Sequence, residues 1–202
     1  MGNRGRFGKY GDIKRVAKLR AARMHPLAPK GPKRPQVGEP ALQKGEWGKG
    51  TGILVRPGRK EDAGFVRALS ERAFKLYGDY GDVIAQWLES GVAETLMAVR
   101  HGRPMGFAMI GKSAELGTQC NRLELLAIAV QERERRKGLG SRLLREIIRP
   151  AKNRGADELM LHTGSDNTAA IRLFQKNGFE VVGLRKAFYP RGQDALVMRK
   201  IL

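Results

Sequence analysis

The chain has 202 residues and carries 39 Lys and Arg against 20 Asp and Glu, which gives a formal net charge of +19. Its one cysteine, Cys120, excludes an intrachain disulfide and a cysteine cluster for a metal, and it favours a reducing compartment. No apolar run reaches the roughly 18 to 20 residues that are needed to span a bilayer. We therefore expect a cytoplasmic protein with no transmembrane segment and no metal.

The basic charge is concentrated at the N-terminal end. Residues 1–52 hold 13 Lys and Arg against 3 Asp and Glu, a net charge of +10 in about a quarter of the chain. Residues 12–24 are typical of a short basic amphipathic helix, and residues 25–52 hold five of the nine prolines and then a run of glycines. We predict a largely disordered basic extension over residues 1–52, in which residues 1–34 contact ribosomal or other RNA, an anionic membrane or the protein's own body.

A folded domain is predicted over residues 53–202, where apolar residues recur with regular periods. The strand at 122–130 is nearly continuous in apolar residues and is therefore expected in the centre of a sheet. Pro150 should shorten or kink the helix that contains it. The expected elements are, in order, a strand at 53–56, helices at 59–76 and 83–89, strands at 94–100, 104–113 and 122–130, a helix at 139–154, a strand at 158–163, a helix at 168–177, and strands at 179–184 and 195–201. Strands that alternate with helices in this way predict an α/β domain.

A turn rich in arginine and glycine joins the strand at 122–130 to the next helix. Arg135, Arg136 and Lys137 are followed there by Gly138-Leu139-Gly140-Ser141. A helix start leaves backbone N–H groups unpaired and carries partial positive charge, and glycines let a ligand approach the main chain. The turn is therefore predicted to bind a pyrophosphate, although it matches neither the P-loop nor the dinucleotide-binding fingerprint.

This turn resembles motif A of the GNAT N-acetyltransferase superfamily, Gln/Arg-x-x-Gly-x-Gly/Ala, and the order of elements over residues 53–202 is also the GNAT order. The C-terminal half is most similar to the ribosomal-protein-alanine N-acetyltransferases. The matching segments include Asn167-x-Ala169-Ala170-Ile171-x-Leu173-Phe174, Gly178-Phe179, Tyr189-Pro190 and Asp194-Ala195. The resemblance implies a GNAT fold, with a mixed twisted sheet of about six or seven strands flanked by helices, and acetyl-CoA as the co-substrate.

The resemblance also implies where acetyl-CoA binds. The strand at 122–130 should carry a bulge that splays it from the strand at 158–163, with pantetheine between the two strands. Asn167 is equally suited to cap the helix at 168–177, and both roles are compatible. Phe174 is expected to pack near the sulfur. The residues implied to bind acetyl-CoA are Ile128, Ala129, Val130, Arg135, Arg136, Lys137, Gly138, Leu139, Gly140, Ser141, Asn167 and Phe174.

The catalytic positions of the ribosomal-protein-alanine branch are not all kept. Phe174 stands where that branch has a tyrosine that protonates the departing thiolate, and His162 stands where it has a glutamate base. An imidazole titrates near neutrality, so His162 is either a candidate base or a satisfied histidine within its strand. The acid must then be another group or a water, or the reaction proceeds without one, since positioning alone supplies much of the acceleration.

Two further residues complete the candidate catalytic set. Glu124 occupies the place where many other GNAT enzymes keep a glutamate that acts through water, and its alternative role is an ion pair with Arg122 or Lys112. Tyr189 resembles one of the two tyrosines with which the branch grips the acceptor peptide, although Phe188 replaces the other. We take Tyr189 as a wall of the acceptor site.

The favoured function is transfer of an acetyl group from acetyl-CoA to a primary amine, foremost a protein N-terminal α-amine, by direct attack in a ternary complex. Residues 53–202 carry a net charge of +9, which would repel polycationic acceptors unless the acceptor groove is locally acidic. One alternative is an acyl-CoA-binding sensor, or a ribosome- or RNA-associated factor, with little turnover. Another is an enzyme for small-molecule amines.

Overall fold

The computed structural model describes residues 52–112 and 122–202, so the predicted extension and Cys120 lie outside the described residues. The strands are β1 (Ile53–Pro57), β2 (Glu94–Arg100), β3 (Arg103–Lys112), β4 (Arg122–Val130), β5 (Glu158–Gly164), β6 (Glu180–Arg185) and β7 (Ala195–Ile201). The helices are α2 (Ala63–Ala73), α3 (Gly81–Ser90), α4 (Leu139–Asn153) and α5 (Thr168–Lys176), with 3₁₀ turns at Lys60–Asp62 and Glu132–Glu134.

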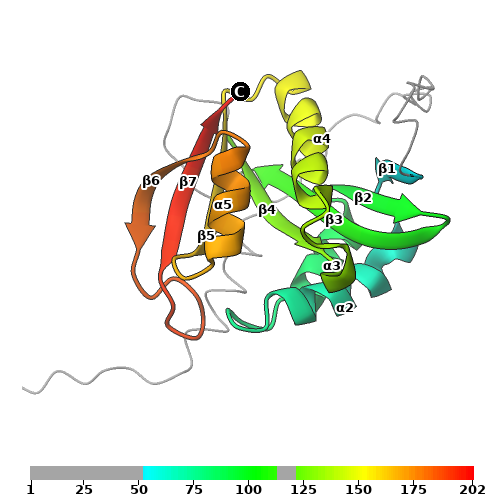
Figure 1. The fold of residues 1–202 in the computed structure, drawn as a ribbon, viewed down its shortest axis with the longest axis horizontal. Coiled ribbons are helices and arrows are strands. Elements are labelled where there is room, and N and C mark those ends of the chain that lie inside the picture. The colour runs from blue at the N-terminus through cyan, green and yellow to red at the C-terminus, as the bar shows by residue number, and fades with distance from the viewer. Residues whose placement is uncertain (1–51, 113–121) are drawn as a thin grey trace, which may run out of the picture. The chain divides into compact units, whose positions relative to one another are not determined.

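The strands form one seven-stranded sheet in the order β1-β2-β3-β4-β5-β7-β6 (Figure 1). Every neighbouring pair is antiparallel except β4 and β5, which are parallel and are joined through α4. The predicted mixed sheet is therefore confirmed, with β4 at its centre. The crossover places the turn before α4 at the ends of the two parallel strands.

One prediction about helix ends is wrong. The helix expected at 59–76 begins with a 3₁₀ turn and ends at Ala73, so that residues 74–80 form a loop before α3. Pro150 does not shorten α4, which continues to Asn153. The proline falls in the last turns of a 15-residue helix, and Ala151 is fully buried in the core there, so packing holds the end of the helix.

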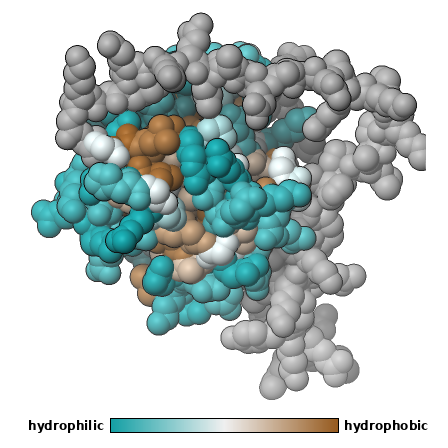
Figure 2. All heavy atoms as spheres, turned by 90° about the vertical axis from the view of Figure 1, so that its right-hand side faces the viewer, coloured by the Kyte–Doolittle hydropathy of each residue, from teal (hydrophilic) through white to brown (hydrophobic). Residues whose placement is uncertain are grey.

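Helices cover both faces of the sheet. Along β3, Ala108 and Ile110 belong to the core cluster packed against α4 and α5, while Phe107 and Met109 belong to the cluster packed against α2 and α3. This alternation is the period of two that a strand imposes on its side chains. Figure 1 shows α4 and α5 in front of the sheet, and Figure 2 shows a mostly hydrophilic surface, broken by apolar areas, on the side where β1 and the β2–β3 hairpin lie.

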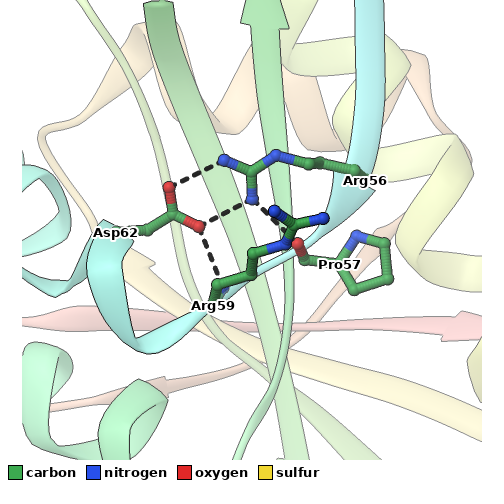
Figure 3. Close-up of polar contacts among 4 residues, drawn as sticks. All are labelled: Arg56, Pro57, Arg59 and Asp62. Carbon is green, nitrogen blue, oxygen red and sulfur yellow. Dashed lines mark hydrogen bonds and ion pairs between the residues drawn. The ribbon is translucent and has the colours of Figure 1, made fainter. Parts of the chain in front are cut away.

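An ion pair fixes the first corner of the domain, where β1 leads into α2 (Figure 3). Arg56 donates to both carboxylate oxygens of Asp62, with Nη1–Oδ2 at 2.7 Å and Nη2–Oδ1 at 2.9 Å. The backbone N–H of Arg59 donates to the same Oδ2 at 2.9 Å. The Arg56 guanidinium holds the pKa of Asp62 below its usual value, despite the opposing effect of burial. The corner therefore depends on an ionised Asp62.

Candidate active site

Strands β4 and β5 part halfway along their length. Their parallel register covers only Arg122–Leu125 against Glu158–Leu161. Beyond this point β4 pairs with β3, and β5 pairs with β7. Residues 126–130 thus have a backbone edge with no strand partner among the described residues, as was predicted for Ile128, Ala129 and Val130.

A bulge at Leu126 accompanies this splay. Leu125 lies opposite Ile110 and Ala127 lies opposite Met109, which leaves Leu126 as the extra residue of β4. The extra residue exchanges the faces of the strand: Leu125 packs with the α4 and α5 cluster, whereas Ala127 packs with the α2 and α3 cluster. The bulge was expected from the resemblance, and its position sets which side chains point to either side of the opening.

The turn after β4 has the geometry of an anion site. Gly138, the N-cap of α4, has φ +80°, and Arg136 has φ +61°, so both lie in the left-handed region. The first turn of α4 has no acidic side chain, and its cap is a glycine without a side-chain acceptor. The N–H groups at the start of α4 therefore have no partner within the helix, and no carboxylate of the first turn would compete with an anion that binds there.

The cations of this turn differ in their surroundings. Arg135 donates from Nε to the carbonyl oxygen of Val130 at 3.3 Å, which ties the turn to the end of β4. Lys137 lies 3.6 Å from Glu134 and its side chain is well exposed, and Arg136 is also exposed. Two exposed cations beside unpaired amides are well suited to a pyrophosphate.

The two glycines of the turn serve different purposes. A Cβ added at Gly138 would meet open space, so its backbone conformation is what requires glycine. A Cβ added at Gly140 would lie 3.3 Å from Leu173 of α5, so Gly140 allows α4 and α5 to approach each other. Ser141, the last residue of the predicted set here, accepts a hydrogen bond from Asn177 Nδ2 at 3.1 Å. The glycines thus shape the entrance between the two helices.

His162 and Glu124 meet where the strands begin to part. His162 is the first residue of β5 beyond its last pair with β4, and its Nδ1 lies 2.9 Å from Glu124 Oε1. The side chains are only 7% and 10% exposed. Arg122, the partner considered for Glu124, pairs with Glu158 at 3.1 Å. A carboxylate only accepts hydrogen bonds, so Nδ1–H donates to Glu124 and the Nε2 lone pair is left for another partner.

Nε2 of His162 is buried and has no hydrogen-bond partner among the described residues. One face of the imidazole stacks on Phe188, with ring centroids 4.6 Å apart and planes 10° apart. Other buried side-chain atoms of the described residues, such as Ser70 Oγ and Thr95 Oγ1, also lack a partner, so it is the position of His162 at the parting of β4 and β5 that makes it a candidate base.

An aromatic wall lies over this pair. Tyr189 meets Phe188 edge to face, with centroids 5.1 Å apart, and its other neighbour is Tyr77, at 4.7 Å. Tyr77 belongs to the loop between α2 and α3, and Gln193 Nε2 donates to the carbonyl oxygen of Leu76 in the same loop. Two loops distant in sequence, 74–80 and 186–194, are thereby joined beside His162. Tyr189 lies in the wall, as expected, and reaches His162 only through Phe188.

Tyr77 was not identified from the sequence. Its hydroxyl donates to Asp166 Oδ1 at 2.8 Å, and burial together with this bond raises the pKa of Tyr77 to about 12. The phenol is therefore protonated at neutral pH. Its ring lies against the backbone of Gly164, the last residue of β5. The sequence signal was weak, because a tyrosine after an amphipathic helix is usually a packing residue.

The remaining predicted residues lie around α5. Asn167 caps the helix, since its Oδ1 accepts a hydrogen bond from Ala170 N at 3.1 Å. Phe174 is 4% exposed and packs edge to face with Phe179 in the core. The cap is thus present, while the roles of Asn167 and Phe174 toward acetyl-CoA stay predictions.

Comparisons with known proteins agree with this geometry. The Acetyltransferase (GNAT) family model matches residues 63–179. An N-alpha-acetyltransferase of Saccharolobus solfataricus is 26% identical over 168 residues, which are 80% of this chain and 100% of that protein. The ribosomal protein bS18-alanine N-acetyltransferase of Salmonella typhimurium is 38% identical over 77 residues, which are 37% of this chain and 52% of that protein.

Solved structures share the fold. The ribosomal-protein-alanine N-acetyltransferase from Brucella melitensis is 28% identical with a TM-score of 0.65, over 74% of this chain and 99% of that one. YncA from Salmonella typhimurium, solved with its cofactor acetyl-CoA, is 23% identical with a TM-score of 0.66, over 75% of this chain and 95% of that one.

The chain therefore belongs to the GNAT family of acetyltransferases, as the sequence predicted. It is an N-acetyltransferase by family. A GNAT family acetyltransferase from Elizabethkingia anophelis, 25% identical with a TM-score of 0.60 over 75% of this chain and 99% of that one, was solved with acetyl-CoA bound. Within residues 52–112 and 122–202, no group of His, Cys, Asp and Glu is arranged to hold a metal ion. None of the helices described in that part of the chain is long and apolar enough to cross a bilayer.

Proposed function

We propose that this enzyme acetylates the α-amine of a protein N-terminus by direct attack of the amine on acetyl-CoA, with His162 as the base and Glu124 as the group that orients it. The observation that carries the proposal is the buried Nδ1–Oε1 contact of 2.9 Å at the apex of the splayed strands, with Nε2 unpartnered. A base must present a free lone pair near the reacting amine, and Nε2 is such an atom.

The two substrates would enter from opposite faces of the sheet. Glu124 and His162 alternate with Leu125 and Leu161, which pack toward α4 and α5, so the catalytic pair points toward α2 and α3. The turn before α4 would hold the pyrophosphate of acetyl-CoA through its backbone amides, with Arg136 and Lys137. Acetyl-CoA supplies an activated thioester. The acceptor would then approach from the side of α2 and α3, along the aromatic wall.

His162 Nε2 would take a proton from the incoming ammonium, and the imidazolium would be stabilised by Glu124. The neutral amine attacks the thioester carbonyl, the C–N bond forms, and the C–S bond breaks. After the C–N bond has formed, the nitrogen loses a second proton, which ends on the departing thiolate. The products are an N-acetyl amide and CoA thiol. Phe174 cannot donate a proton, and no general acid is assigned there, because positioning of the amine and the thioester supplies much of the rate.

The surroundings of His162 suit a single positive charge. The carboxylates of Glu124 and Asp166 lie beside the rings of Tyr77, Phe188 and Tyr189, and aromatic faces attract cations. This local acidity offsets the basic character of the rest of the domain. It favours one ammonium on an extended peptide over a polycation, whose further charges would meet the basic surface.

The test measures CoA thiol release with a peptide that has a free N-terminal alanine, a blocked peptide that contains one lysine, and spermidine. We expect turnover with the free N-terminus alone. His162→Asn should lower kcat/KM by about 10²- to 10⁴-fold with unchanged acetyl-CoA affinity. His101→Asn is the matched control, since His101 is exposed in the β2–β3 turn at φ +48°, which asparagine tolerates. Saturable acetyl-CoA binding without turnover on any amine would instead indicate a sensor.

A contact between residues 1–34 and ribosomal RNA stays a prediction, and with it a cytoplasmic location. The described part of the chain has a separate basic feature, a groove of about 510 Å³ whose charged lining residues are all cations: Arg145, Lys152, Lys176 and Lys200. Binding through phosphates should weaken steeply as salt rises. Retention on ribosomes that is unchanged by deletion of residues 1–50 at low salt would contradict the prediction.

A further inference from the structure

Gln193 carries a buried side-chain oxygen, Oε1, that has no hydrogen-bond partner among the described residues. The residue lies in loop 186–194, and its Nε2 donates to the carbonyl oxygen of Leu76 in loop 74–80. Because a carbonyl oxygen only accepts hydrogen bonds, this contact fixes the orientation of the amide, with the NH₂ group toward Leu76 and Oε1 on the other side. A buried acceptor without a donor is costly, so Oε1 is suited to a donor that binds from outside the chain.

Only His162 shares this feature at the candidate site, within the part of the chain that the structure describes. Its Nε2 is likewise buried and unpaired, and it accepts because Nδ1–H donates to Glu124. The other buried atoms without a partner belong to ion-paired groups or to core positions of α2 and β2: those of Glu94, Arg122, Glu158, Ser70 and Thr95. Gln193 and His162 are therefore a pair of orphaned acceptors in one region.

The aromatic wall connects the two acceptors. Phe188 stacks on the ring of His162, and Tyr189 packs both on Phe188 and on Tyr77. Gln193 holds the residue directly before Tyr77. A ligand that follows the wall from His162 therefore reaches Gln193 after a short run of aromatic rings.

The loop that carries Gln193 is held in place by its own contacts. Asp194 accepts hydrogen bonds at both carboxylate oxygens, at 2.7 Å from Lys186 Nζ and at 2.9 Å from a backbone N–H of the same loop. The carbonyl oxygen of Asp194 accepts from the N–H of Ser165, just after β5, at 3.0 Å. Gln193 is thus positioned before a ligand binds, which lowers the entropy lost on binding.

We propose that Gln193 is an acceptor-binding residue, whose Oε1 receives a backbone N–H of the acceptor peptide while His162 Nε2 receives its terminal ammonium. This inference rests on the proposed function. An extended peptide presents its ammonium and its following N–H groups at a fixed spacing of roughly 3.5 Å per residue, so it can satisfy both acceptors at once. A polyamine has no amide N–H, and the ammonium of a lysine side chain stands at the end of a flexible methylene chain. The Gln193 bond therefore selects for a peptide N-terminus.

The test replaces single amide bonds of the acceptor by ester bonds, each of which removes one backbone N–H with little change of shape. Peptides with a free N-terminal alanine carry the ester before the second, third or fourth residue. With wild type, one of these esters should lower kcat/KM by about 3- to 10-fold, the range of a single hydrogen bond, and the others should have little effect. In Gln193→Met, which keeps the side-chain length without the amide, the all-amide peptide should lose a similar factor and that ester should cause no further loss.

The matched control is Gln175→Met, the same change at an exposed position of α5, and thermal unfolding checks that both variants are folded. If Gln193 only tied the two loops together, Gln193→Met would slow every peptide by the same factor and leave the effect of the ester intact. That result, or wild-type turnover that is equally fast with every ester peptide, would overturn this inference alone. Absence of turnover with every peptide, including the all-amide one, would refute the proposed function and with it this role of Gln193.

Discussion

The substitution Gly164→Ala tests the aromatic wall without touching a catalytic group. A Cβ on Gly164 would overlap the ring of Tyr77, which is 7% exposed, so the ring must be displaced from its packed position. Displacing the ring breaks its hydrogen bond to the Asp166 carboxylate and its contact with Tyr189. A hydrogen bond to a charged group contributes about 1.5–3 kcal/mol and an aromatic pair about 0.5–1.5 kcal/mol. The predicted loss of stability is therefore about 2–4 kcal/mol.

The assay combines thermal unfolding with steady-state kinetics. At roughly 2–4 °C per kcal/mol for a domain of this size, Gly164→Ala should lower Tm by about 5–15 °C. It should raise KM for the acceptor more than it changes acetyl-CoA affinity, because the displaced ring borders only the acceptor side. Gly64→Ala is the control: it lies in α2 with open space around it and should be neutral or slightly stabilising.

A double-mutant cycle assigns the cause. In a Tyr77→Ala background the ring is absent, so the further cost of Gly164→Ala should fall below about 1 kcal/mol. If Gly164→Ala left Tm and acceptor KM at wild-type values, or cost as much without the Tyr77 ring as with it, the inferred packing of this wall would be wrong.

Three further predictions concern other parts of the chain. Asp62→Asn should lower the free energy of unfolding by about 2 kcal/mol near pH 7. Because folding lowers the pKa of Asp62, this stabilisation is present above the unfolded-state pKa of about 4 and is lost as the pH falls through the folded-state pKa. Urea melts of the variant and the wild type should therefore converge in acid, and a gap that stays constant with pH would refute the role of the charge. Gly138→Val should weaken acetyl-CoA binding at least tenfold in calorimetry, since valine is strained at φ +80°, and unchanged affinity would contradict the assignment of the turn. Glu124→Gln should lower kcat about 10²-fold and move the acidic limb of the pH profile, where the base loses its proton, toward lower pH, while both KM values stay near wild type. A pH-independent loss would indicate a structural role alone.

Much of the fold follows from periodicity. The strand at 122–130 and the helix after Gly138 are long and strongly patterned, so their type and order are set by local preferences that tertiary contacts reinforce. The end of α2 at Ala73 was not predictable in this way. Apolar residues continue to Leu76, but the chain must leave the helix there for Tyr77 to reach Asp166 and Gly164, which lie far away in the sequence.

In the candidate site, too, local patterns identify single residues, whereas distant contacts decide how those residues meet. Glu124 and His162 could be named one by one from the sequence, yet their contact depends on the parallel register of β4 and β5 and on the bulge at Leu126. The stacking of Phe188 on His162 depends on how the loop 186–194 folds back, which no local pattern specifies. Residues whose function depends on a partner distant in the chain are therefore the ones that sequence patterns miss.

Hydrogen exchange with and without acetyl-CoA tests the central claim most directly, namely that the splayed strands and the start of α4 form the slot for the coenzyme. The backbone amides of residues 126–130 and 138–141 have the free edge and the unpaired helix start, so binding should slow their exchange while β1 and β6 stay unchanged. Acetyl-CoA that protects neither segment, or that protects a different part of the sheet, would contradict this account of the site.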